Sequence, residues 1–403
     1  MILTLAARNV LRQKRRSLFT ILTMVGGLAL AAITIGWVDG SYNYLIDVFT
    51  RNITGHLQVH AAGYLDRPSL YKTVDGYDSV GRVIERNRSA KAWAPRLYAA
   101  GLAAVGDKST AAEITGIDPG REQATLGFAA KVKRGSPLAD TAAGWAVVGK
   151  GLAGILKAGL DSTVVVASQA ADGSIANDQY RVCGIIETGD EQADRMALYL
   201  HIGDAQRLLV LEGRAHELIV VAASLGRTDG LTRDLRQQLR NGNLDVQPWQ
   251  VVARAFYQSM EADKKGHTIM FLVIMLIVAV GVLNTVLMSV LERTREYGVL
   301  RAVGTRPGQI FRMVVAEVIV LALVSVVVGT LAGLAGNWLL SLRGIKFPPT
   351  DVGGITFDTM KGEITAKSIY LPALLVLFSS FLVSVFPARR AAGIEPAKAM
   401  RIH

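Results

Sequence analysis

Residues 269–291 read IMFLVIMLIVAVGVLNTVLMSVL, which is 23 consecutive positions without a charged side chain. An α-helix rises about 1.5 Å per residue and the hydrocarbon core of a bilayer is about 30 Å thick, so about 20 apolar residues are enough to cross it. The stretch therefore predicts a membrane-spanning helix.

Three further segments have the same character. Leu18–Val38 and Ile369–Ala388 carry no charge, and Met313–Leu340 carries a single charge at Glu317. The first follows a basic stretch and contains Ala29-Leu30-Ala31, as a cleaved signal peptide would. Its apolar run is longer than such peptides need and continues past that site, which favours a retained helix. The sequence predicts four spans.

Basic residues surround these spans unevenly, within a chain whose formal net charge is +11. They gather before the first span, between the second and third, and after the fourth: Arg8, Arg12, Lys14, Arg15, Arg16; Arg293, Arg295, Arg301, Arg306, Arg312; Arg389, Arg390, Lys398 and Arg401. Cytoplasmic loops have this bias, so the charge indicates membrane topology rather than nucleic-acid binding. Both termini are expected in the cytoplasm.

The predicted organisation follows from these two patterns. It comprises a cytoplasmic amphipathic helix (1–17), span 1 (18–38), an extracytoplasmic domain (39–267), span 2 (268–291), a cytoplasmic segment (292–312), span 3 (313–340), an outside loop (341–368), span 4 (369–388) and a cytoplasmic tail (389–403). The loop 341–368 also carries basic residues, at lower density than the inside segments.

The 39–267 domain mixes alternating strand-like runs with helical stretches. We expect a mixed α/β domain in two lobes, with helical stalks at 39–54 and 249–267 continuing the first two spans. One cysteine, Cys183, allows no intrachain disulfide.

The sequence contains patterns that resemble catalytic or cofactor-binding motifs, but the neighbouring residues do not fit such a site. Gly144-x4-Gly149-Lys150 resembles a phosphate-binding loop, but Gly151 stands where Ser or Thr would hold magnesium. We interpret the stretch as a strand, a glycine turn and a short helix. The six histidines have no metal-ligand spacing. No catalytic, cofactor or metal residue is predicted, and the chain is not expected to be an enzyme.

Polar and small residues inside the spans are few. Glu317 is interpreted as an anchor paired near Arg312, or as part of a path of conformational coupling. Gly329 and Gly333 form a small-xxx-small pattern that allows close helix contact. Asn284 and Asn337 could lock helix contacts, and the spans otherwise lack residues to line a channel.

A short charged helix is predicted directly after span 2. Its residues are Glu292, Arg293, Thr294, Arg295, Glu296, Tyr297, Gly298, Val299, Leu300, Arg301, Ala302, Val303 and Gly304. Val299, Leu300 and Val303 are expected on one face, with Arg295, Glu296 and Arg301 toward solvent or a partner. Gly304 is a plausible cap, and Pro307 prevents backward continuation.

The motif E-R-T-R-E-Y-G-V-L-R-A-V-G resembles the coupling helix of FtsX/MacB-type ABC transporter permeases. Residues 5–16 resemble their N-terminal amphipathic helix, and residues 387–401 resemble their C-terminal tail. Three segments of the outside domain are most similar to the lipoprotein-releasing branch of the family, and next to the macrolide/peptide efflux branch: 147–153, 184–189 and 204–209. Tyr297 departs from the Ile usual in the family, but an aromatic ring should still pack there.

The resemblance implies a permease of the bacterial inner membrane that pairs with a second copy or a paralogue. A separate, dimeric ABC-type ATPase would use ATP and Mg at the coupling helix, and this chain would bind no cofactor. Motion passed through the stalks would move lipophilic, lipoprotein or peptide cargo outside the membrane, with a periplasmic or outer-membrane partner. Two alternatives stay open: a permease-like regulator that activates a cell-wall hydrolase, and a membrane scaffold without an ATPase.

Overall fold

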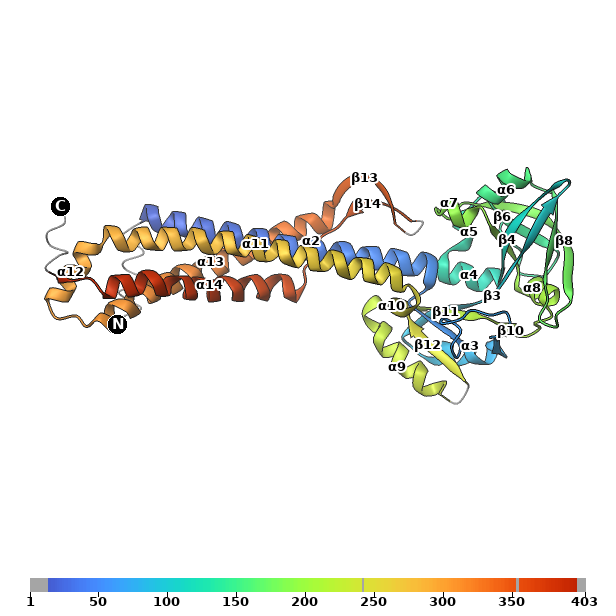
Figure 1. Ribbon diagram of the computed structural model, residues 1–403, viewed down its shortest axis with the longest axis horizontal. Helices are drawn as coiled ribbons and strands as arrows, with labels where there is room; N and C mark the ends of the chain where they lie inside the picture. Colours follow the sequence, from blue (N-terminus) through green and yellow to red (C-terminus); the bar gives the residue numbers. More distant parts are fainter. Residues whose placement is uncertain (1–13, 241–242, 353–354, 397–403) are drawn as a thin grey trace. The chain divides into compact units, whose positions relative to one another are not determined.

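A computed structural model describes residues 14–240, 243–352 and 355–396 (Figure 1). Most of the predicted N-terminal amphipathic helix and the end of the C-terminal tail lie outside these ranges. The chain divides into two compact units. We call them the helical unit (up to Tyr44, Met260–Phe347 and from Thr359) and the β-rich unit (Leu45–Ser259 with Pro348–Asp358).

Four helices are long and apolar enough to cross a membrane. The four are α2 (Lys14–Phe49), α11 (Arg254–Glu292), α13 (Pro307–Arg343) and α14 (Ala366–Ala392). A short helix, α12 (Thr294–Ala302), lies between α11 and α13. A mixed α/β domain lies between the first two in sequence, which confirms the predicted fold class. Each helix extends beyond its apolar run because backbone hydrogen bonds within a helix need no lipid to persist.

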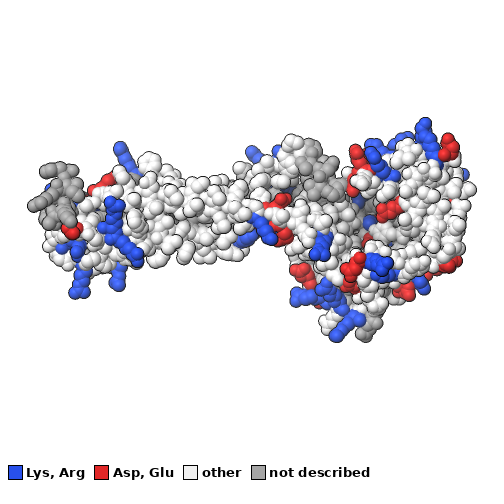
Figure 2. All heavy atoms as spheres, in the orientation of Figure 1, with Lys and Arg blue, Asp and Glu red and all other residues white. Residues whose placement is uncertain are grey.

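Apolar side chains from all four long helices form the interior of the helical unit. Its buried members are Met24, Leu28, Ala31, Ile35, Phe271, Met275, Val278, Val282, Val286, Val318, Ala322 and Val376. On the face shown in Figure 2, Lys and Arg gather at the end of the bundle that carries α12, and the middle of the bundle carries few charges. This distribution is the one that a bilayer requires.

The segment predicted as the outside loop 341–368 contains secondary structure that the sequence analysis missed. Strands β13 (Ile345–Val352) and β14 (Ile355–Met360) pair with each other as a two-stranded sheet. α13 continues to Arg343, and α14 begins at Ala366 with the Thr365 hydroxyl accepting a hydrogen bond from the Ser368 amide. The unstructured part of the predicted loop is therefore short.

One ten-stranded sheet organises the β-rich unit, in the order β12-β1-β11-β3-β4-β9-β6-β8-β5, with β7 paired to β3 and β8. Its strands are β1 (Leu57–Ala61), β3 (Ala90–Val105), β4 (Lys108–Ile117), β5 (Val132–Gly135), β6 (Trp145–Gly149), β7 (Thr163–Gln169), β8 (Ile175–Ile186), β9 (Ala197–His201), β11 (Glu217–Ala222) and β12 (Leu244–Pro248). β2 (Val74–Asp75) and β10 (Arg214–Ala215) form a separate pair. The helices are α3 (Tyr77–Arg86), α4 (Pro119–Leu126), α5 (Phe128–Lys131), α6 (Lys150–Leu156), α7 (Glu191–Asp194), α8 (Ile202–Leu209), α9 (Thr228–Gln238) and α10 (Trp249–Val252).

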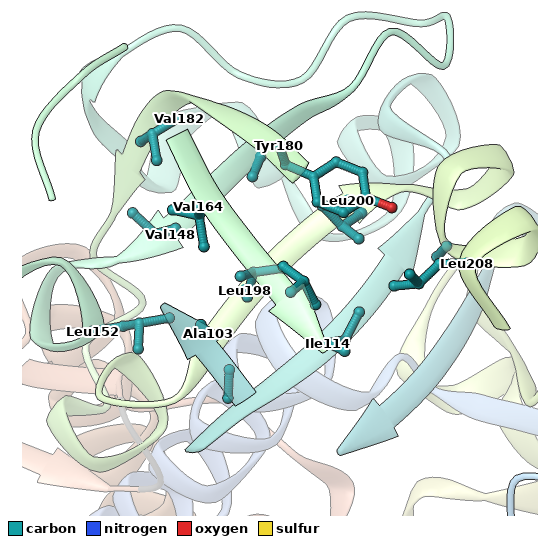
Figure 3. Close-up of a cluster of buried hydrophobic side chains, with 14 of the residues drawn as sticks. Ala103, Ile114, Val148, Leu152, Val164, Tyr180, Val182, Leu198, Leu200 and Leu208 are labelled. Carbon is teal, nitrogen blue, oxygen red and sulfur yellow. The ribbon is translucent and has the colours of Figure 1, made fainter. Parts of the chain in front are cut away.

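Two large hydrophobic clusters flank this sheet, and β3 contributes to both. Leu97 and Ala103 belong to the cluster in Figure 3, with residues of β4, β6, β8 and β9. Trp93 belongs to the other cluster, with residues of β1, β11, α3 and α9. The two expected lobes are thus two cores on one continuous sheet.

The glycines of the false phosphate-binding motif serve close packing. A Cβ on Gly149 would lie 2.2 Å from the Asp194 carbonyl oxygen, and one on Gly151 would lie 2.9 Å from the Arg195 Cα. β6 ends at Gly149 and α6 begins at Lys150, so the strand–turn–helix interpretation agrees with the structure. Any side chain at either glycine would displace the backbone after α7.

The stalk segments are helical with one interruption each. Helix α2 ends at Phe49 and is followed by a π-helix over Thr50–Thr54. On the other side, α10 ends at Val252 and α11 begins at Arg254. Unit boundaries fall inside α2 and α11.

Three histidines of the β-rich unit are buried: His56, His60 and His216 are at most 1% exposed. Burial, followed by the charge of Arg51, lowers the pKa of His56 to about 4, against an opposing effect of Asp47. Burial also lowers the pKa values of His60 and His216. Among the described residues, no group of His, Cys, Asp and Glu could hold a metal. The lowered pKa values leave the three rings neutral near pH 7.

We predict that acidification destabilises the β-rich unit. Because the unfolded chain binds protons at these histidines before the folded chain does, the stability is complete above pH 6.5 and falls as the pH approaches 4. His56 alone would account for about 3 kcal/mol. The measurement is the thermal unfolding midpoint at pH 7.5 and pH 5. His56→Asn keeps an acceptor for the Ala222 amide and should weaken the pH dependence; an unchanged dependence would contradict the assignment.

Candidate functional site

The predicted coupling segment folds as α12 between two membrane helices. α11 ends at Glu292, and α12 covers Thr294–Ala302. Gly304 follows the helix at φ +99°, and the Thr305 amide donates to the Leu300 carbonyl (3.0 Å). Glycine adopts this left-handed backbone without steric cost, which ends the helix and lets α13 start at Pro307.

The faces of α12 differ from the sequence prediction. Tyr297 is 1% exposed and packs in a cluster with Val290, Ile310, Val314, Ala388 and Ala391. Val299, Leu300 and Val303 are 48%, 38% and 82% exposed, so the prediction that they lie on a different face from the exposed Arg295 and Glu296 was wrong, and Arg301 is half-buried. One helical turn places Val299 beside Arg295 and Leu300 beside Glu296, so apolar and charged side chains share the outer face. The bulky Tyr297 takes the inner one.

Arg293 attaches α12 to the membrane helices. Its side chain is 9% exposed, and its Nη1 atom lies 3.0 Å from Glu317 Oε2 of α13. Its Nε atom donates to Glu296 Oε2 at 2.8 Å, and its guanidinium lies 5.2 Å from the centre of the Tyr297 ring. One buried guanidinium therefore connects α13 with two residues of α12.

Glu317 is paired, as the sequence analysis expected, but with Arg293 instead of the neighbouring Arg312. Arg312 and Glu317 are five positions apart on α13, and that spacing puts them on different sides of a helix. Only the fold of α12 back toward α13 brings Arg293 within reach.

A small cavity of about 30 Å³ lies next to this ion pair. Ser17, Thr20, Thr285, Ser289 and Glu317 provide its polar lining, and Tyr297 is also part of its wall. This volume is enough for a water molecule, and hydroxyl groups are the partners that buried water needs. The cavity can hydrate the carboxylate of Glu317 inside the bundle.

Gly329 and Gly333 of α13 lie against α2. A Cβ on Gly333 would lie 2.6 Å from the Ala32 Cβ, and one on Gly329 would lie 3.1 Å from the Leu28 Cβ. Asn337, one turn further along, is 1% exposed and donates through Nδ2 to the Ala32 carbonyl (2.9 Å). Small residues and one amide hold α2 and α13 together. Asn284, by contrast, is exposed.

Two family models together cover nearly all of the chain. The MacB-like periplasmic core domain matches residues 17–262, and the FtsX-like permease C-terminal domain matches residues 268–396. The chain belongs to the FtsX/MacB family of ABC transporter permeases. It is thus the membrane permease part of an ABC transporter and a protein of the inner membrane.

The chain is similar to proteins of several organisms. The lipoprotein-releasing system transmembrane protein LolC of Neisseria meningitidis serogroup B is 24% identical, over 98% of this chain and 97% of the relative. The macrolide export ATP-binding/permease protein MacB 1 of Aeromonas hydrophila is 37% identical, over 30% of this chain and 17% of the relative. The periplasmic region of MacB from Actinobacillus actinomycetemcomitans covers 49% of this chain and 91% of that structure, with 17% identity and a TM-score of 0.38.

Sequence reasoning included Arg293 in the coupling segment but missed its role. The partner Glu317 was singled out as a charge within a span, and that signal was sound. The sequence did not predict the geometry of the turn between α11 and α12, and this turn decides which arginine reaches the carboxylate of Glu317.

We predict that Arg293→Met lowers the unfolding midpoint of the detergent-solubilised chain, because it leaves Glu317 buried without its cation, at a cost of roughly 3–5 kcal/mol. Arg295→Met, on the exposed face of the same helix, is the matched control and should change stability by less than about 0.5 kcal/mol. Adding Glu317→Leu to Arg293→Met should recover most of the loss. Equal midpoints for the two arginine variants would rule out the ion pair as an anchor.

A second prediction concerns the contact between α2 and α13. Gly333→Leu should destabilise the helical unit by about 1–3 kcal/mol, because the new side chain meets Ala32. Ala332→Leu, at the neighbouring exposed position, is the control and should leave the midpoint unchanged. Comparable losses in both variants would show that the glycine has no special packing role.

Proposed function

We propose that the outer face of α12 is the docking surface for a separate ABC-type ATPase, and that both chain termini lie on the same, cytoplasmic side. Three exposed apolar residues, Val299, Leu300 and Val303, stand beside exposed Arg295 and Glu296. Apolar centres with charged rims are typical of protein interfaces. The arginines near α12 support the cytoplasmic placement.

The attachment of α12 supports a mechanical role. Arg293 binds α13, and Tyr297 packs against residues of α11, α13 and α14. A displacement of α12 by the ATPase would therefore act on three membrane helices at once. α2 and α11 are unbroken helices that reach residues of the β-rich unit, at Leu45 and Ser259. We propose that ATP-driven motion is transmitted along them to the periplasmic domain.

The cargo proposal rests on the match along the whole length of the chain. The relative named as a lipoprotein-releasing transmembrane protein is matched over 97% of its length. The macrolide exporter is matched over 17% of its length. We therefore propose that this chain, paired with a second permease, helps move a lipoprotein or similar lipophilic cargo at the outer surface of the membrane. Peptide efflux is the less favoured alternative.

The test is affinity purification of the chain from its native membranes, with mass spectrometry of the retained proteins. A soluble ATPase should be retained at a stoichiometric level. The double variant Leu300→Glu/Val303→Glu should lower this retention by at least tenfold, because it places two carboxylates in the apolar part of the contact, where they would lose their hydration without a partner. These substitutions leave the Arg293–Glu317 pair intact.

Ile175→Glu is the matched control, because Ile175 is an 87% exposed apolar residue of the β-rich unit. It should retain the ATPase fully. Release of a radiolabelled lipoprotein from proteoliposomes on ATP addition would then test the cargo. Full ATPase retention by the α12 variant would refute the docking surface. If the unmodified chain retains the ATPase but releases no lipoprotein, only the cargo proposal is refuted.

A further inference from the structure

A cavity of about 400 Å³ opens in the β-rich unit, between α4, α5, the loop before α7, and the π-helix after α2. α4, α5 and α7 appear on the same side of the domain in Figure 1. The cavity has an apolar wall of Ile53, Phe128 and Ile186, and a polar wall that includes Arg96, Glu122, Lys131 and Tyr199. A volume of this size suits a small organic ligand.

Arg96 is neutralised within the protein. Its Nε atom donates to Glu122 Oε1 at 3.1 Å, its Nη1 atom donates to the Tyr98 hydroxyl at 3.1 Å, and Glu217 Oε1 lies 4.0 Å from Nη1. Two carboxylates therefore surround one guanidinium. Glu122 is 1% exposed, and its second oxygen, Oε2, is buried without a hydrogen-bond partner among the described residues.

Lys131 has no such partner. Its Nζ atom donates to the Asn52 carbonyl of the π-helix at 2.6 Å, and no described carboxylate lies within ion-pair distance. Burial, followed by the positive charge of Arg96, lowers the pKa of Lys131 to about 8, against an opposing effect of Glu122. Lys131 is half-buried, so its ammonium loses part of its hydration, and an anion in the cavity would supply a counter-charge.

The other polar groups of the lining allow this assignment. Burial raises the pKa of Tyr199 to about 12, so its hydroxyl keeps a proton to donate. At the rim, Glu187 pairs with Lys150 at 3.1 Å, and Asp190 accepts from the Gln192 and Ala193 amides as the cap of α7. The acidic groups around the cavity are thus already paired or bonded, apart from one oxygen of Glu122.

We propose that this cavity binds a small organic anion, a carboxylate or phosphate group joined to an apolar part. Lys131 and Tyr199 donate to the anion, the apolar part lies against Phe128 and Ile53, and Glu122 Oε2 accepts a hydroxyl of the ligand where one is present. Since Lys131 also binds the Asn52 carbonyl of the π-helix, an anion on Lys131 would act on the segment that directly follows α2. The site is independent of the ATPase proposal, because no part of it involves α12.

The experiment is calorimetric titration of the full chain, in phosphatidylcholine nanodiscs, with phenyl phosphate, benzoate, inorganic phosphate and uncharged benzyl alcohol. Phenyl phosphate and benzoate should bind saturably, inorganic phosphate more weakly, and benzyl alcohol not at all. Dihexanoyl phosphatidic acid distinguishes the two sources of such an anion. If it binds more tightly than phenyl phosphate and the two displace each other, the ligand is a lipid headgroup. If it binds more weakly, the ligand is a free small anion.

Lys131→Met should weaken phenyl phosphate binding by at least tenfold. Lys133→Met, at an exposed lysine two residues further along, is the matched control and should stay within twofold. Tyr199→Phe removes one hydroxyl and preserves packing, and it should weaken binding about three- to tenfold. This variant tests the site even if Lys131→Met does not fold. Absence of saturable binding by the unmodified chain, equal binding of benzyl alcohol, or unchanged affinity in both site variants would overturn the proposal.

Discussion

The hydrocarbon core of a bilayer supplies no hydrogen-bond partners and solvates no charge, and the helical unit is organised by this constraint. Backbone groups are satisfied inside four long helices, and charges lie near the helix ends. Two polar side chains inside the helices are exceptions, and each has a specific partner. Glu317 is a carboxylate within a helix, so it needs a cation, and Arg293 provides it from outside the span. Asn337 is a buried amide, so it binds the Ala32 carbonyl.

The Arg293–Glu317 pair gives α12 its place. A nine-residue helix is too short to be stable alone in water, so its position depends on what it contacts. The buried guanidinium fixes its beginning, and the ring of Tyr297 fixes its middle against three other helices. The opposite face, where Val299 and Leu300 stand beside Arg295 and Glu296, then remains exposed, as the proposed docking surface requires.

The β-rich unit uses burial differently. Its sheet carries two apolar cores that share β3. The histidines are neutral and packed, whereas Arg96 is neutralised by carboxylates. Lys131 is a half-buried cation whose hydrogen bond, within the described part of the chain, goes to the Asn52 carbonyl. This contrast between neutralised and uncompensated charge distinguishes the proposed anion site from the other polar groups of the domain.

The sequence by itself determined the four spans, the mixed α/β domain between the first two, the short helix after the second span and the family. Each of these follows from local signals: apolar run length, the distribution of arginines, and a contiguous motif. It also indicated Glu317, Gly329 and Gly333, because charges and small residues are conspicuous within apolar helices. Only the tertiary structure decided that Arg293 pairs with Glu317, that Val299, Leu300 and Val303 face outward, and that Arg96, Glu122 and Lys131 line one cavity. These outcomes depend on turns and on strand order, which bring together residues far apart in sequence, and no local pattern encodes the distance between two such side chains.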